Sequence, residues 1–171
     1  MLLFVVALIT ACKDDEKPER FFIYKGQKIS LAKGFLVNLG SYTDGDDEYF
    51  EWGVAFASNG VDIEDSESFT GQGDLILISL DVLNDDSRLP AGTYTFDPAE
   101  GEHLADGSVV FINFNFGDLG DDGNTVYEDI DEMEVVVTKS GSNFTITYTL
   151  EFAEGETITG KFQGALTDVE D

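Results

Sequence analysis

The strongest constraint on the fold of this chain is an alternation of apolar and polar residues with a period of two. In segment 144–152 every second residue is apolar, and threonines and a glutamate lie between them. This pattern places one face of a β-strand in a core and the other in water. The apolar members of this and four similar runs are Phe144, Ile146, Tyr148, Leu150 and Phe152; Phe50, Trp52, Val54 and Phe56; Ile76, Ile78, Leu80 and Val82; Val110, Ile112, Phe114 and Phe116; and Met133, Val135 and Val137.

Turn-forming residues separate these runs. Ser140-Gly141-Ser142 and Glu154-Gly155-Glu156 lie at hairpin spacing between the last three runs, so the chain should end in a meander. No segment has the pattern of a helix. We therefore predict an all-β fold, a single antiparallel β-sandwich or β-barrel of roughly eight to ten strands with a C-terminal meander.

Two glycines in the last predicted strand lie on its inward side. Gly160 and Gly164 alternate there with Ile158 and Phe162. A missing side chain inside a strand admits a neighbouring aromatic ring or marks a bulge. We interpret these glycines as packing features and not as a site.

The charge of the chain limits its partners. With 35 Asp and Glu against 9 Lys and Arg, the formal net charge is -26, which repels nucleic acid and anionic membrane surfaces. Hydrophobic residues make up 42% of the chain, enough for a core, so the acidity does not indicate disorder. We expect one all-β domain over residues 21–171 and no binding to nucleic acid.

The N-terminal residues have the features of a cleaved signal. Ten of the first eleven residues are apolar, about half the ~20 that a spanning helix needs. The sole cysteine follows the small residue Ala11 and has no partner for an intrachain disulfide. Ile9-Thr10-Ala11-Cys12 resembles the lipobox of bacterial lipoproteins. The resemblance implies that residues 1–11 are removed, with cleavage between Ala11 and Cys12, and that Cys12 carries a lipid that anchors the protein in a membrane.

The residues after Cys12 resemble a second signal. Lys13-Asp14-Asp15-Glu16 is similar to the acidic export signal of surface-exposed lipoproteins of Bacteroidota, which implies a lipid-anchored protein on the outer face of the outer membrane. Residues 12–20 would then comprise the lipidated Cys12 and an acidic tether. The alternative to an export signal is that Lys13 to Arg20 form only a solvated tether. The chain continues with a strand, an acidic loop, an aromatic strand, the run Pro90-Ala91-Gly92-Thr93-Tyr94-Thr95-Phe96, and a meander that ends Gly160-Lys161-Phe162-Gln163-Gly164. This order resembles small all-β lipoproteins of the same phylum, and the resemblance implies no activity and no site residues.

Two acidic, glycine-containing loops are candidates for calcium, the one cofactor that the composition suggests. Calcium takes several oxygen ligands from flexible loops, although neither loop has the spacing of an EF-hand. The alternative is that Asp and Gly simply form good turns. The candidate ligands are Asp44, Asp46, Asp47 and Glu48 in the first loop, and Asp118, Asp121, Asp122 and Asn124 in the second.

Three aromatic residues near the first loop are candidates for a sugar-stacking platform. Trp52 shares its face with Phe50 and Val54, so we expect it in the core. Tyr42 and Tyr49 remain open as binding residues.

No catalytic motif emerges from the sequence. The only histidine, His103, lies in a Glu-rich, glycine-flanked stretch that is typical of a loop, and no companion motif supports a triad or a zinc site. With 35 acids, no single pair of carboxylates is informative for glycoside hydrolysis.

These features predict a function in binding. We expect a surface-anchored, non-catalytic lipoprotein that binds an extracellular ligand or partner. The alternative is a barrel that carries a small lipophilic ligand inside, because eight or more Phe-rich strands can enclose a cavity. A glycan hydrolase ranks third.

Overall fold

Strands are the only regular structure in the residues that the computed structural model describes, 17–65, 68–85, 88–96, 103–117 and 125–169. This confirms the predicted all-β class. The strands are β1 (Arg20–Tyr24), β2 (Gln27–Ser30), β3 (Lys33–Asp44), β4 (Asp47–Ala57), β5 (Val61–Ile63), β6 (Phe69–Leu83), β7 (Gly92–Thr95), β8 (His103–Asn115), β9 (Thr125–Tyr127), β10 (Ile130–Ser140), β11 (Asn143–Phe152), β12 (Thr157–Gly164) and β13 (Thr167–Val169).

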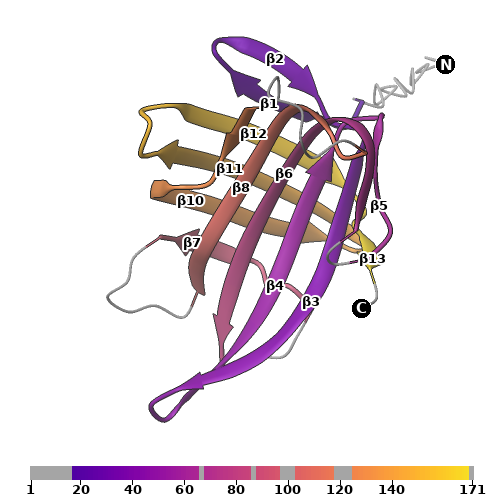
Figure 1. Cartoon of the computed structure of the whole chain (residues 1–171). Coiled ribbons are helices and arrows are strands. Elements are labelled where there is room, and N and C mark those ends of the chain that lie inside the picture. Colours follow the sequence, from indigo (N-terminus) through magenta and orange to yellow (C-terminus); the bar gives the residue numbers. More distant parts are fainter. Residues whose placement is uncertain (1–16, 66–67, 86–87, 97–102, 118–124, 170–171) are drawn as a thin grey trace, which may run out of the picture.

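Most of these strands join one curled sheet that nearly closes into a barrel (Figure 1). Its order is β13-β3-β4-β6-β8-β7-β10-β11-β12-β1-β2, with β9 paired to β8. In Figure 1, β3, β4, β6 and β8 form the near layer, and β10, β11 and β12 form the far layer. β5 pairs with the first residues of β6 in a small second sheet. All pairs are antiparallel except β13 with β3 and β7 with β8.

The structure differs from the prediction in its short strands. The described residues contain thirteen strands, of which β2, β5, β7, β9 and β13 have only three or four residues. Such lengths are too short to show an alternation. The predicted meander is confirmed in β10, β11 and β12. The prediction of a loop at His103 was wrong, because backbone pairing with Val82 extends β8 to this residue despite its glycine-rich surroundings.

Large apolar side chains fill the space between the two layers. The five alternating apolar residues of β11 are at most 3% exposed, as their period predicts. Across the interior, the ring of Phe56 in β4 stacks on Tyr148 in β11 and on Phe162 in β12, with centroids 5.5 and 5.0 Å apart. Trp52 is buried in the same cluster, which confirms its predicted place in the core.

Glycines let these rings approach the backbone. A Cβ atom at Gly160 would overlap the Tyr148 ring, and one at Gly34 would overlap Phe162. The prediction that Gly160 admits an aromatic ring is therefore confirmed. Gly164 lies instead against the guanidinium of Arg20.

Arg20 joins strands on both sides of the gap at which the barrel is incomplete. Its Nε donates to the carbonyl of Gln163 (2.8 Å), and its Nη1 donates to the carbonyl of Ala32, just before β3 (2.9 Å). The guanidinium also lies 5.0 Å above the Phe162 ring. One side chain thus connects β1, β12 and the start of β3.

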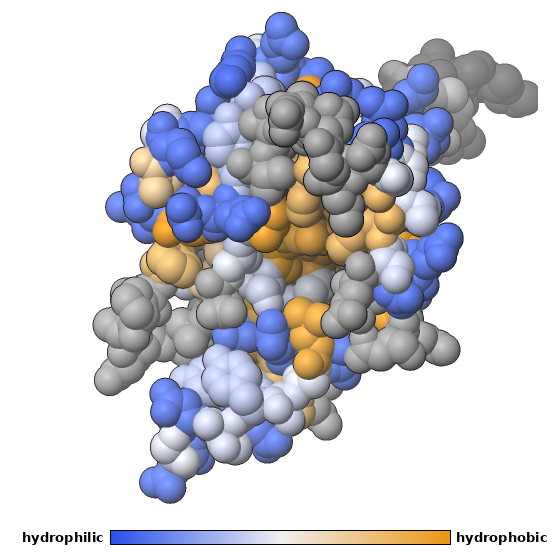
Figure 2. Space-filling view, in the orientation of Figure 1, coloured by the Kyte–Doolittle hydropathy of each residue, from blue (hydrophilic) through white to orange (hydrophobic). Residues whose placement is uncertain are grey.

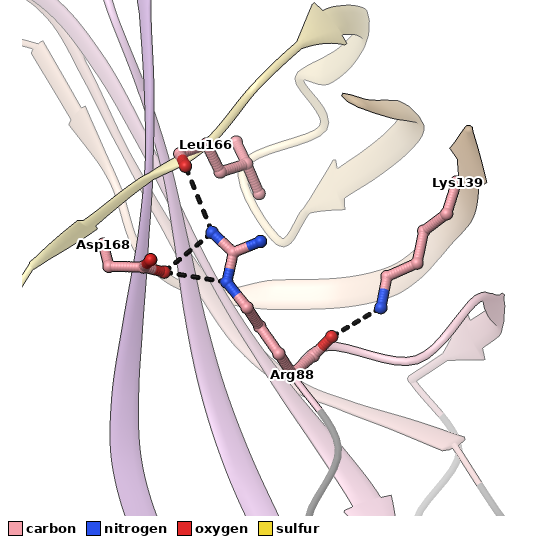
Figure 3. Close-up of polar contacts among 4 residues, drawn as sticks. All are labelled: Arg88, Lys139, Leu166 and Asp168. Atoms are coloured by element: carbon pink, nitrogen blue, oxygen red, sulfur yellow. Dashed lines mark hydrogen bonds and ion pairs between the residues drawn. The ribbon is translucent and has the colours of Figure 1, made fainter. Parts of the chain in front are cut away.

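Arg88 holds the last strand in place (Figure 3). Its Nε and Nη2 donate to the Asp168 carboxylate (2.8 and 2.7 Å), and Nη2 also donates to the carbonyl of Leu166 (3.1 Å). Lys139 donates in turn to the carbonyl of Arg88 (2.5 Å). These contacts fix the connection between β12 and β13, so that β13 can pair in parallel with β3.

A pair of tyrosines links β1 to β9. The hydroxyl groups of Tyr24 and Tyr127 are 3.0 Å apart, and the Tyr127 ring also packs on Phe152. Burial, together with the hydrogen bond that Tyr127 shares with Tyr24, raises the pKa of Tyr127 to about 12. The neutral phenol is therefore the form that the folded protein favours.

We predict that the Gly160→Ala substitution destabilises the protein by about 1–3 kcal/mol, because the new methyl group forces the Tyr148 ring out of its place. The measurement is the free energy of unfolding in urea. Gly107→Ala is the matched control, since a Cβ at Gly107 meets no atom within 4 Å and should cost nothing. Equal effects of the two substitutions would contradict the packing described above.

We further predict that Tyr127 weakens the folded state at alkaline pH. Its contribution to stability is complete below pH 10, the ordinary pKa of tyrosine, and is lost as the pH rises toward about 12. The urea midpoint of the unmodified protein should therefore fall more steeply between these values than that of Tyr127→Phe. Parallel curves for the two proteins would show that the pKa of Tyr127 is not raised.

Candidate functional site

The outer face of β3, β4 and β6 carries apolar side chains, whereas the outer face of a barrel is usually wet. Ala55 and Ala57 of β4 and Leu75 of β6 are buried there, although their neighbours in sequence point into the core. With Phe35 and Val61 they form a second apolar cluster, separate from the main core. A sheet that is apolar on both faces needs a cover or offers a binding surface.

One part of this outer face is covered by the chain itself. Val61, which belongs to the second cluster, comes from β5 and covers this part of the face. Four phenylalanine rings lie beside it, with neighbouring centroids 4.9–5.7 Å apart: Phe69, Phe111, Phe114 and Phe116. These side chains form a wall along one side of the face. Among the described residues of β3 and β4, this face reaches water at Leu39, which is exposed, and at Gly53, which is half-buried.

Beside this wall lies an apolar hollow of about 140 Å³. Figure 2 shows apolar side chains gathered in a depression of this face. The polar hydroxyl of Ser79 lies at one end of the hollow. The lining residues are Val37, Leu39, Gly53, Val54, Ala55, Ile63, Phe69, Leu77, Ile78 and Ser79.

A glycine and a β-bulge create the hollow. Gly53 offers no side chain to the outer face, and a Cβ placed there would lie 3.3 Å from Leu39 Cδ1. The pairing of β3 with β4 is irregular between Asn38 and Gly40, where the Gly40 amide donates to the Asn38 side chain (2.9 Å). The bulge brings Leu39 over Gly53 and leaves it 42% exposed. Leu39 thus forms a rim that water reaches.

A row of acidic side chains follows the hollow along the strands. Gly53 pairs with Ser79, and the next outward pair is Glu51 with Asp81. Ser79 Oγ donates to Glu51 Oε1 (2.6 Å), and the hydroxyl of Tyr42 donates to the Asp81 carboxylate (2.8 Å). We call Glu51 and Asp81 the acidic row. Their hydrogen bonds fix the carboxylates next to the apolar surface.

A pair of stacked tyrosines forms the next row. Tyr42 and Tyr49 are cross-strand neighbours in β3 and β4, and their rings stack with centroids 5.3 Å apart and planes at 15°. Tyr42 is 44% exposed. Sequence alone left both tyrosines open, and the structure places them at the end of the acidic row, where they extend the amphipathic surface.

The predicted calcium ligands of the first loop lie at the tip of the β3–β4 hairpin. Asp44 pairs with Asp47 across the turn at Gly45. Among the residues that the structure describes, no three His, Cys, Asp or Glu side chains are grouped so as to hold a metal ion. Calcium binding stays a prediction. The second loop, with Asp118, Asp121, Asp122 and Asn124, lies outside the described residues, as do Ala11, Cys12 and Lys13–Glu16.

A larger polar depression lies over β7, β10 and β11. It has a volume of about 610 Å³, and its carboxylates, from Asp131, Glu132, Glu134 and Glu151, are all exposed. The glycan hydrolase that ranked third on the sequence stays a prediction.

The sequence did contain a signal for the hollow. Residues 53–57 and 75–78 are apolar or glycine without interruption, which is typical of strands buried on both faces. The position of the acidic row could not be found in the same way, because it depends on the register of three strands.

Comparison of the chain with family models, with curated proteins and with solved structures finds no match. The described residues contain no helix with the length and apolar content needed to cross a bilayer. The candidate site thus consists of an apolar hollow, an acidic row and a tyrosine pair on one face of the near layer.

Proposed function

We propose that this protein is a lipid-anchored, cell-surface lipoprotein that binds an extracellular partner through the hollow on the outer face of β3, β4 and β6. The observation that carries the proposal is the apolar surface around Gly53 and Leu39, which lies on the outside of a domain whose own core is already filled. An apolar hollow beside fixed polar groups is the usual form of a binding site. This function requires no catalytic group.

The proposed anchor would hold the domain close to the membrane. Among the described residues, Glu19 lies near the N-terminal end and is tied to the domain: its carbonyl accepts the Gln163 amide (2.8 Å), and its carboxylate pairs with Lys161 (2.5 Å). Seven residues separate Cys12 from this point on the chain, counting Glu19, and they span at most about 25 Å when extended. In Figure 1 the tip of the β3–β4 hairpin lies at the opposite end of the barrel from the β1–β2 hairpin.

The described interior gives no specific support to a carrier of lipophilic ligands. Such a carrier needs an apolar cavity between the layers. The rings of Phe56, Tyr148 and Phe162 occupy that space. We therefore place the proposed binding surface outside the barrel.

A neutral apolar dye tests whether the hollow binds. Residues 17–171 contain every described strand and both apolar clusters, and are therefore used for this measurement. We expect Nile red to bind with increased fluorescence, and Gly53→Leu to raise its dissociation constant at least about tenfold by filling the hollow. Thr147→Leu, on the outer face of β11, is the matched control and should bind dye like the unmodified domain.

Gly53→Leu should fold, because glycine is unfavourable inside a strand and the nearest atom is the mobile end of Leu39. Leu39→Thr, at an exposed position, is a second variant that should weaken dye binding. Absence of dye binding by the unmodified domain, or equal binding by all variants, would refute the proposed binding surface.

The anchor is tested in cells. Cys12→Ala should abolish incorporation of labelled palmitate and release the protein from the detergent-phase fraction, since the lipid is the proposed attachment. Replacement of Lys13–Glu16 by serines should leave lipidation intact but protect the protein from protease added to whole cells. Equal digestion of the unmodified protein and the serine variant would contradict the proposed export signal. It would leave the proposed anchor unaffected.

A further inference from the structure

We propose that the partner is a protein that presents an extended segment with one large apolar side chain and, two residues further on, a lysine or arginine. The apolar side chain enters the hollow and the basic group reaches Glu51. This inference rests on the proposed function and specifies the chemistry of the partner.

The size of the hollow limits what enters it. Pockets for small molecules usually have volumes of about 300–1,000 Å³. The hollow has about 140 Å³ and is apolar except for Ser79. It therefore takes in a single apolar side chain or one end of a small apolar molecule such as Nile red, and is too small to enclose a complete cofactor or lipid.

The charge beside the hollow selects a cationic neighbour. Glu51 is half-buried at the edge of the hollow and is held by Ser79. Lys33, at the start of β3, is already engaged with Asp62 of β5 at 2.6 Å. The hairpin tip adds Asp44, Asp46, Asp47 and Glu48, and the whole chain carries a net charge of -26. A field of this sign attracts basic partners and repels acidic ones.

The distance between two neighbouring rows of outward residues sets the sequence pattern of the partner's extended segment. Successive outward residues of a strand are two positions apart, or about 6.8 Å. The row of Gly53 and Ser79 and the row of Glu51 and Asp81 are separated by this step. An extended segment that runs antiparallel to β4 has the same repeat and passes Gly53 before Glu51, so a basic residue two positions after the apolar one lies over Glu51. The next step reaches the rings of Tyr42 and Tyr49, which also attract cations.

The tyrosine pair favours a peptide over a sugar. A sugar ring stacks on the open face of an aromatic ring. Here the two rings use one face on each other, and the Tyr42 hydroxyl is engaged by Asp81. The aromatic surface is thus partly consumed, whereas the carboxylate of Glu51 keeps acceptor capacity for a cation.

The experiment is a titration of residues 17–171 with short blocked peptides of threonine and one leucine, in which the residue two positions after the leucine is lysine, glutamine or glutamate. We expect the lysine peptide to bind about twofold to fivefold more tightly than the glutamine peptide, and the glutamate peptide to bind weakest. The difference should shrink in high salt. Amide NMR shifts should change at Gly53 and Ser79.

Two variants separate the contributions. Gly53→Leu should weaken all peptides at least about tenfold, and Glu51→Gln should remove the preference for lysine while leaving the glutamine peptide unaffected. The matched controls are Glu134→Gln, at an exposed position of β10, and Thr147→Leu. They should change neither the affinity for the peptides nor the preference for lysine.

The outcomes distinguish this inference from the proposed function. If Nile red binds at the hollow but the three peptides bind equally, or if the preference survives in Glu51→Gln, the basic partner is refuted and the binding surface stands. If a panel of oligosaccharides binds and Gly53→Leu abolishes that binding, the partner is a glycan and this inference is overturned. If neither dye nor peptide binds, both proposals fail.

Discussion

The stacking of Phe56 on Tyr148 and Phe162 sets the distance between the two layers, and the rest of the structure depends on it. The rings fit only because Gly34 and Gly160 carry no side chains. Phe162 in turn supports the guanidinium of Arg20, which connects β1, β12 and the start of β3. The packing of the core and the joining of the gap in the barrel are therefore parts of one contact network.

A filled interior has a consequence for the outer face. β4 and β6 are central strands of the near layer, and both have apolar side chains on their two faces. The inward side chains pack in the main core. Among the described residues, the outer set of side chains is covered by β5, by Val169 of β13 and by the phenylalanine wall, and part of it contacts water around Gly53 and Leu39. Exposed apolar surface next to fixed carboxylates is unfavourable unless a partner buries it.

The parts of the fold that could be predicted from the sequence are those in which one face of a strand is wet. In β10, β11 and β12 the alternation is clear, and it identified the meander and the buried rings of β11. The short strands β5, β7, β9 and β13 exist because a longer neighbour pairs with them, and such pairing leaves no local pattern. The hollow was missed because the apolar residues of 53–57 and 75–78 were assigned to a single face. Glu51 and Asp81 could not be joined to Tyr42 without the register of β3, β4 and β6.

Two features that form the hollow, Gly53 and the bulge at Asn38–Gly40, would be unfavourable in a strand that had only a structural role. Glycine at 53 forgoes packing and is disfavoured in the middle of a strand. The bulge at Asn38–Gly40 interrupts the pairing of β3 with β4, and it holds Leu39 where water reaches it. Filling Gly53 would improve the sheet locally, and removing the bulge would restore its hydrogen bonds. Local departures of this kind from strand preferences tend to coincide with functional sites, because the surface they create is useful only when a partner occupies it.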